Sequence, residues 1–168
     1  MPAVSNSSPL ILFASIGRLD LLQGVFGDIY VPDAVWREVV TDGGERLDAV
    51  QVVEAHWIKP RSVAQAVVAR ELAQSLGDGE AEAIALALEI GDQIPLLLDD
   101  RKARAIARRL QLNIIGNSGL LVLAKNRSLI ALVRPILDQL HGAGLYLDDA
   151  VRAQLLRAAG EPMNESRE

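Results

Sequence analysis

The sequence predicts an α/β fold in which a mainly parallel sheet is covered by helices on both faces. Short segments of β-forming residues alternate along the chain with longer amphipathic segments of helical character. Half of the 168 residues are apolar, which is enough for the core of one domain. No linker, internal repeat or low-complexity tract divides the chain. We therefore expect a single domain over residues 1–168, with its core in residues 1–160 and a frayed polar tail in residues 161–168.

Turn and cap residues indicate where the helices between the strands begin and end. Pro9 suits the first turn of a helix, and Gly17 can end that helix. Asp33 and Asp78 can cap two later helices. Beyond residue 115 the pattern is helical to about Gly160. The strands predicted between these helices are residues 3–5, 28–31, 56–59, 94–98 and 113–115.

The composition excludes several kinds of protein. No cysteine is present, so disulfides and thiolate metal sites are excluded, and we expect a reducing, cytoplasmic environment. We find no secretory signal and no apolar run near the roughly 18 residues of a membrane helix, so we expect no membrane partner. The net charge of -5 argues against binding of nucleic acid over the whole surface and limits such binding to a local basic patch.

Small polar and acidic residues follow three of the predicted strands. Because the carboxyl ends of parallel strands meet at one edge of a sheet, we expect these residues near one another, where open α/β folds bind ligands. The first group alternatively forms only a capping turn before the helix that follows it. The residues are Asn6, Ser7 and Ser8 after the first strand, Asp99 and Asp100 after the fourth, and Asn117 and Ser118 after the fifth.

Two further acids lie on predicted helices. Glu38 lies beside the apolar face that contains Val35 and Val39. Glu80 lies in the first turn of an alanine-rich helix, four residues before Ile84, which places it over the apolar stripe of that helix. A carboxylate directed toward a core needs a partner, a raised pKa or a cation.

Each acid also has an ordinary structural explanation. Asp99 or Asp100 could cap the helix that follows them. Glu80, with Glu82, could interact with the dipole at the start of its own helix, and Glu38 could be a solvated helical side chain. Taken together, however, these carboxylates come from separate segments and would repel one another at one sheet edge without a cation.

The residue types indicate which cation would bind. Oxygen ligands without His or Cys suit Mg²⁺ or Mn²⁺. A zinc site is poorly supported, because His56 and His141 lie in unrelated segments. Arg101 and Arg104 lie at the start of the helix that follows the acids of the fourth strand and could bind phosphates beside such a metal, although a solvated basic face explains them as well.

Five motifs occur in a characteristic order and spacing. They are VSNSSPLI, VPDAVWREVV, GDGEAEAIALALEIG, LLLDDRKARAIARRL and IIGNSGLL. In this order they resemble the PIN-domain family, and most closely its VapC-like branch, whose members often open with Asn-Ser-Ser-Pro. The resemblance covers about residues 4–160.

The resemblance implies a three-layer α/β/α sandwich that binds Mg²⁺ or Mn²⁺ and cleaves RNA. Carried over by position, Glu38, Glu80 and Asp99 are the catalytic and metal-binding acids, and Asp100 can substitute for Asp99. The other site residues are Asn6 as a further metal ligand, and Asn6, Ser7, Arg101, Arg104 and Ser118 as contacts to the RNA substrate.

The departure from the family pattern lies at Asn6, where typical PIN nucleases have an aspartate among their metal ligands. Asparagine offers a carbonyl oxygen but no charge, so it attracts a divalent ion less strongly. Two hypotheses follow: a metal-dependent ribonuclease, and a catalytically weak or inactive PIN-like module that binds RNA or protein. The resemblance also implies the toxin of a toxin–antitoxin pair, with a small antitoxin as partner and a homodimer.

Other α/β functions fit the sequence less well. Phosphoryl transfer of the haloacid dehalogenase or response-regulator kind suits Asp99 and Asp100 at a strand end. The Asp-x-Asp of the former is missing after the first strand, where Ser8 and Pro9 supply no nucleophile. A Rossmann or P-loop nucleotide binder fits less well still, because no glycine-rich phosphate loop follows any predicted strand.

Overall fold

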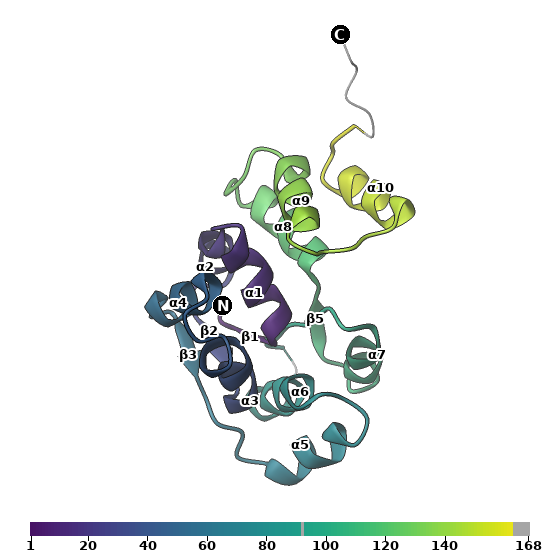
Figure 1. The fold of residues 1–168 in the computed structure, drawn as a ribbon. Helices are drawn as coiled ribbons and strands as arrows, with labels where there is room; N and C mark the ends of the chain where they lie inside the picture. The colour runs from purple at the N-terminus through teal and green to yellow at the C-terminus, as the bar shows by residue number, and fades with distance from the viewer. Residues whose placement is uncertain (92, 163–168) are drawn as a thin grey trace.

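The computed structural model describes residues 1–91 and 93–162, which form one five-stranded sheet with helices on both faces (Figure 1). Every strand pairing in this sheet is parallel, and the strand order is β3-β2-β1-β4-β5. The predicted α/β class is therefore confirmed. The strands are β1 (Ala3–Ser5), β2 (Ile29–Val31), β3 (Ile58–Pro60), β4 (Pro95–Leu97) and β5 (Asn113–Ile115).

The helices complete a three-layer α/β/α arrangement. The α-helices are α1 (Ser7–Ser15), α2 (Leu19–Phe26), α3 (Asp33–Trp36), α4 (Leu47–Glu54), α5 (Ala66–Ala73), α6 (Asp78–Ile90), α7 (Arg101–Arg109), α8 (Asn117–Asn126), α9 (Val133–Gly142) and α10 (Asp149–Ala158). A π-helical turn, η1 (Arg37–Thr41), continues α3. Pro9 lies in the first turn of α1, and Gly17, with φ +67°, follows its end, as predicted.

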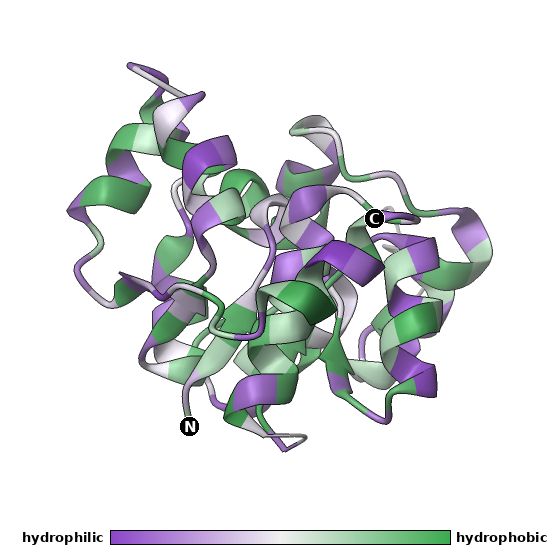
Figure 2. Cartoon of the chain, turned by 90° about the horizontal axis from the view of Figure 1, so that it is seen from below, coloured by the Kyte–Doolittle hydropathy of each residue, from purple (hydrophilic) through white to green (hydrophobic). Residues whose placement is uncertain are grey.

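The strands place alternate side chains on two apolar cores, as the two-residue period of a strand requires. Leu96 and Leu98 pack in the core that includes α6 and α7, whereas Leu97 between them belongs to the core that includes α1, α2, α8 and α9. Figure 2 shows apolar and polar residues alternating along the outer helices, which is typical of helices with one face on a core. Both faces of the sheet are therefore covered by apolar cores.

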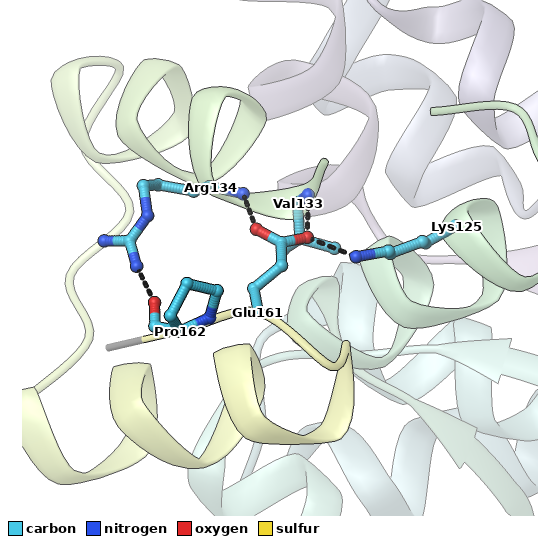
Figure 3. A network of polar contacts seen from close by, with 5 residues as sticks. All are labelled: Lys125, Val133, Arg134, Glu161 and Pro162. Atoms are coloured by element: carbon cyan, nitrogen blue, oxygen red, sulfur yellow. Dashed lines mark hydrogen bonds and ion pairs between the residues drawn. The ribbon is translucent and has the colours of Figure 1, made fainter. Parts of the chain in front are cut away.

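Three expectations about the ends of elements are wrong. Asp33 and Asp78 are the first residues of α3 and α6, and the capping positions belong to the residues before them. Glu161, which we expected in a frayed tail, is 6% exposed and is bonded to the start of α9 (Figure 3). Residues 163–168 of that predicted tail lie outside the described residues. Within the described part of the chain, no helix is long and apolar enough to cross a membrane.

Candidate active site

The carboxyl ends of β1 and β4 meet at the centre of the sheet, where the strand order reverses. From this point β2 and β3 extend to one side of β1, and β4 and β5 to the other. The backbone N–H of Asn6 donates to the carbonyl of Leu97 at 3.1 Å and joins the two strand ends. Open α/β sheets bind ligands at such a switch point, outside the carboxyl ends of their strands.

A cavity of about 1080 Å³ lies at this end of the sheet. Its lining includes most of the site residues predicted from sequence, although Asn6 and Asp100 are not among the described lining residues. Apolar lining residues come from α1, α8, α10 and the segment 143–147. The charged, hydroxyl and amide side chains in the lining are those of Ser7, Ser8, Glu38, Glu80, Asp99, Arg101, Arg104, Ser118 and Gln154. The structure thus brings predicted acids, arginines and serines from α1, η1, α6, α7, α8 and the end of β4 to one cavity.

Glu38 reaches the cavity from η1. The Ser7 hydroxyl donates a hydrogen bond to Glu38 Oε2 at 2.8 Å, which fixes the carboxylate against the start of α1. Gly79 of α6 leaves room for this carboxylate, because a Cβ at position 79 would lie 3.0 Å from Glu38 Oε2. Single π-helical turns are frequent at functional sites. Glu38 is a solvent-exposed residue, and the hydrogen bond from Ser7 holds its carboxylate in position.

Asp99 is a partly buried acid with three donors around it, and its side chain is 24% exposed. Its Oδ1 accepts from the backbone N–H of Asn117 at 3.3 Å and pairs with Arg104 Nη1 at 3.5 Å. The side-chain amide of Asn117 donates to Oδ2. Burial raises the pKa of Asp99 above its usual value, and the Asn117 donors and Arg104 oppose this shift without cancelling it. The protein therefore compensates the Asp99 charge only in part.

Asp100 and Glu82 have structural partners instead. Asp100 Oδ1 accepts from the backbone N–H of Ala103 at 2.7 Å and caps α7. Of the two aspartates after β4, only Asp99 is among the described residues that line the cavity. Glu82 accepts from the backbone N–H of Ala34 at 2.8 Å, so it stabilises the start of α3 rather than that of its own helix.

Two buried amide oxygens near the carboxyl ends of β1 and β5 have no hydrogen-bond partner among the described residues. They are the Oδ1 atoms of Asn6 and Asn117, and both residues are 2% exposed. Asn6 occupies the N-cap position of α1, but its side chain makes no capping bond. A buried carbonyl oxygen costs free energy unless it meets a donor, a water or a cation. These two oxygens are therefore candidate ligands for a cation or for ordered water.

The carboxylates do not form a metal site by themselves. Within residues 1–91 and 93–162, no group of three His, Cys, Asp or Glu side chains lies close enough together to hold a metal ion. The predicted convergence of three or four carboxylates on one point is therefore not found. The available donors are carboxylate and amide oxygens, and this set fits Mg²⁺, which binds through one or two carboxylates and retains several waters.

Comparison with known proteins identifies the family. A family model described as a PIN domain matches residues 2–161. The chain belongs to the PIN-domain family. No curated protein and no solved structure matches it. PIN domains have a nuclease-type fold and generally use divalent metal ions, which agrees with the oxygen-rich cavity of this PIN domain.

Sequence reasoning missed the glycine that lets Asp99 and Arg104 approach each other in this PIN domain. Gly116 precedes α8, and a Cβ at this position would lie 2.8 Å from Asp99 Oδ1 and would also meet the Arg104 guanidinium. The motif GNSG predicts Asn117 and Ser118 as polar groups of the site. The close approach of Asp99 and Arg104 to Gly116 is a tertiary contact, so the local sequence does not predict it. Gly116 thus contributes to the site because its missing side chain leaves room for Asp99 and Arg104.

Proposed function

We propose that this PIN domain is a divalent-metal-dependent ribonuclease. The observation that carries the proposal is the cavity at the switch point of the sheet, whose lining contains Glu38, Glu80 and Asp99 together with Arg101 and Arg104. Acids can hold a cation that activates water, and guanidinium groups can bind phosphates, so the lining suits metal-assisted hydrolysis of a phosphodiester.

One or two of the carboxylates of Glu38, Glu80 and Asp99 would hold the ion, because these three described residues do not lie close enough together to share it. The amide oxygens of Asn6 and Asn117, which have no partner among the described residues, would be neutral donors. We assign Asp99 rather than Asp100 to this set, because Asp100 is engaged in capping α7. When bound, the ion lowers the pKa of a coordinated water and neutralises charge on the scissile phosphate.

The other polar residues position the RNA strand. Arg104 holds Asp99 with one guanidinium nitrogen, and together with Arg101 it presents further N–H donors to phosphate oxygens. The hydroxyls of Ser8 and Ser118 line the same cavity and can donate to a phosphate oxygen. A carboxylate of the site accepts the proton of the attacking water as the bond from phosphorus to the leaving oxygen breaks.

Purified protein is expected to cleave single-stranded RNA in Mg²⁺ or Mn²⁺ and to stop in EDTA. Asp99→Asn and Glu80→Gln are each expected to lower the cleavage rate about 100-fold or more, because each removes charge from the metal-binding set. Asp100→Asn is the matched control, since the amide oxygen of asparagine can still cap α7. Cleavage that continues unchanged in EDTA, or that survives both substitutions, would contradict the proposal.

A catalytically weak or inactive PIN-like module that binds RNA or protein is the second candidate function. Asn6 favours it, since a neutral side chain stands at the strand end where typical PIN nucleases carry an acid. Such a module would bind RNA equally well with Mg²⁺ and with EDTA and would cut it under neither condition. The same RNA assay therefore separates the two functions.

The proposal extends to the toxin of a toxin–antitoxin pair that forms a homodimer and binds a small antitoxin. Its support is the resemblance to the VapC-like branch in the opening VSNSSPLI and in the motifs that follow it.

Gly116→Ala is expected to lower RNA cleavage by about 10- to 100-fold, because the new methyl group displaces Asp99 and Arg104 from their present positions. The backbone at position 116 has φ -88°, which alanine adopts without strain, so a folded protein is expected. Gly142→Ala is the control, since a Cβ there meets nothing within 4 Å. Equal cleavage rates for the two variants would show that the close packing around Asp99 has no role.

A further inference from the structure

The apolar side of the cavity has no role in the phosphate chemistry proposed above. It is formed by residues of α1, α8 and α10 and of the segment between α9 and α10. We call these residues the apolar wall: Ile11, Leu12, Val122, Leu147, Val151 and Leu155. The acids and arginines of the cavity provide for a phosphate, so the apolar wall is available to a different part of the ligand.

Tyr146 lines the same cavity and presents an aromatic ring beside the apolar wall. Its side chain is 80% exposed, the highest value among the large apolar residues that the structure describes. Leu145 and Leu147, its neighbours, are partly buried against the core. The ring is therefore exposed to solvent, while its two chain neighbours are partly buried.

The segment that carries Tyr146 is fixed at both ends. The N–H of Leu145 donates to the carbonyl of Leu140 at 2.9 Å, and the carbonyl of Leu145 lies 3.1 Å from His141 Nδ1. On the other side, Asp148 accepts from the N–H of Val151 at 2.8 Å and caps α10. The backbone that carries the ring is therefore anchored on both sides, so a ligand that stacks on Tyr146 does not have to order the segment itself.

We infer that Tyr146 and the apolar wall form a base-stacking subsite, which holds one unpaired nucleobase of RNA beside the phosphate bound at the polar side. The inference rests on the proposed ribonuclease function. Arg101 and Arg104 favour RNA over an apolar peptide as the occupant, because they provide for the phosphates that accompany a base. A base can stack on a protein ring only after it leaves a duplex, so the substrate is single-stranded at that nucleotide.

The test compares Tyr146→Ala with Tyr146→Phe, which keeps the ring, and with Leu47→Ala, which removes an apolar side chain of similar exposure from α4, outside the described cavity lining. The probe is a short single-stranded RNA that carries the fluorescent base 2-aminopurine, bound in Mg²⁺ by proteins that also carry Asp99→Asn so that the RNA stays intact. Stacking quenches the fluorescence. We expect Tyr146→Ala to weaken binding about 5- to 150-fold and to lose the quenching, whereas Tyr146→Phe and Leu47→Ala retain both.

A fully paired RNA of the same sequence is expected to bind equally to the Tyr146→Ala protein and to its parent. In the proteins with Asp99 intact, we expect Tyr146→Ala to raise KM for RNA cleavage more than it lowers kcat. Equal RNA binding and equal quenching by the Tyr146→Ala protein and its parent would overturn the subsite. This holds even if the apolar wall is found to bind an apolar peptide instead. If binding and quenching are equal but the wild type cleaves RNA, the proposed ribonuclease function is supported and only the subsite is overturned. If no RNA is cut but Tyr146-dependent quenching persists, the subsite stands in a binding module.

Discussion

Asn6→Asp is expected to make the fold depend on a divalent ion and to speed RNA cleavage. The Asn6 side chain is 2% exposed, and its Oδ1 has no partner among the described residues, so a carboxylate there carries an uncompensated buried charge. In EDTA we expect the variant to lose about 3 to 5 kcal/mol of unfolding free energy, which is a fall in Tm of roughly 6 to 20 °C. Millimolar Mg²⁺ is expected to restore most of this loss, because the ion binds only the folded site.

Thermal denaturation in EDTA and in Mg²⁺ measures this effect. Asn6→Ala is the matched control, because it adds no charge and should show no additional response to Mg²⁺. Adding Asp99→Asn to the Asn6→Asp protein should remove the recovery, if both residues face one ion. At subsaturating Mg²⁺ the added charge is expected to raise cleavage on the order of 10-fold. A loss of Tm that is equal in EDTA and Mg²⁺ would place Asn6 outside any cation site.

The positions of the strands in the sequence could be predicted, because most of them are short apolar runs that end at polar residues. In β4 the run ends with Leu97 and Leu98, which are buried on opposite faces of the sheet, and Asp99 follows at once. Burial on both faces leaves such a mark in the local sequence. The observed strand ends differ from the predicted ends by at most two residues. The exact end depends on where pairing with the neighbouring strand stops, which the local sequence does not determine.

The choice between Asp99 and Asp100 could not be made from the sequence. Both follow β4, and either could cap the next helix. The structure separates them because parallel pairing of β4 with β5 brings Asn117, eighteen residues later, against Asp99, while Asp100 turns to Ala103. The local sequence thus predicts the acids of the site. It does not predict their hydrogen-bond partners, which depend on tertiary contacts.

Glu161 shows the same limit more strongly. A carboxylate in a polar segment near the end of the chain has the local pattern of a solvated residue. In the structure its Oε1 accepts from Lys125 Nζ at 2.8 Å and from the N–H of Val133 at 2.6 Å, and its Oε2 accepts from the N–H of Arg134 at 3.1 Å (Figure 3). These donors lie 27 to 36 residues earlier in the chain. Glu161 therefore connects the end of the fold to α8 and to the start of α9, which lacks a capping side chain of its own.

Glu161→Ala is expected to lower the unfolding free energy by about 3 to 5 kcal/mol, or the Tm by roughly 6 to 20 °C. The substitution leaves the Lys125 ammonium and two N–H groups of α9 without their acceptor. Glu45→Ala, at an exposed acid, is the control and should change the free energy by about 0.5 kcal/mol or less. Chemical denaturation at pH 7 measures both, and equal midpoints would contradict the role of Glu161.

The same carboxylate makes the fold sensitive to acid. Burial alone would raise the pKa of Glu161, but the Lys125 ammonium and the N–H groups of Val133 and Arg134 outweigh burial and hold the pKa below its usual value of 4.5. Because the folded pKa lies below the unfolded one, this stabilisation is complete above the unfolded pKa and is lost as the pH falls through the folded pKa. The Tm difference between wild type and Glu161→Gln should therefore be constant from about pH 7 to pH 5 and shrink progressively below that. A difference that persists in strong acid would mean that glutamine fails through its shape, since a protonated glutamate carries no charge to lose.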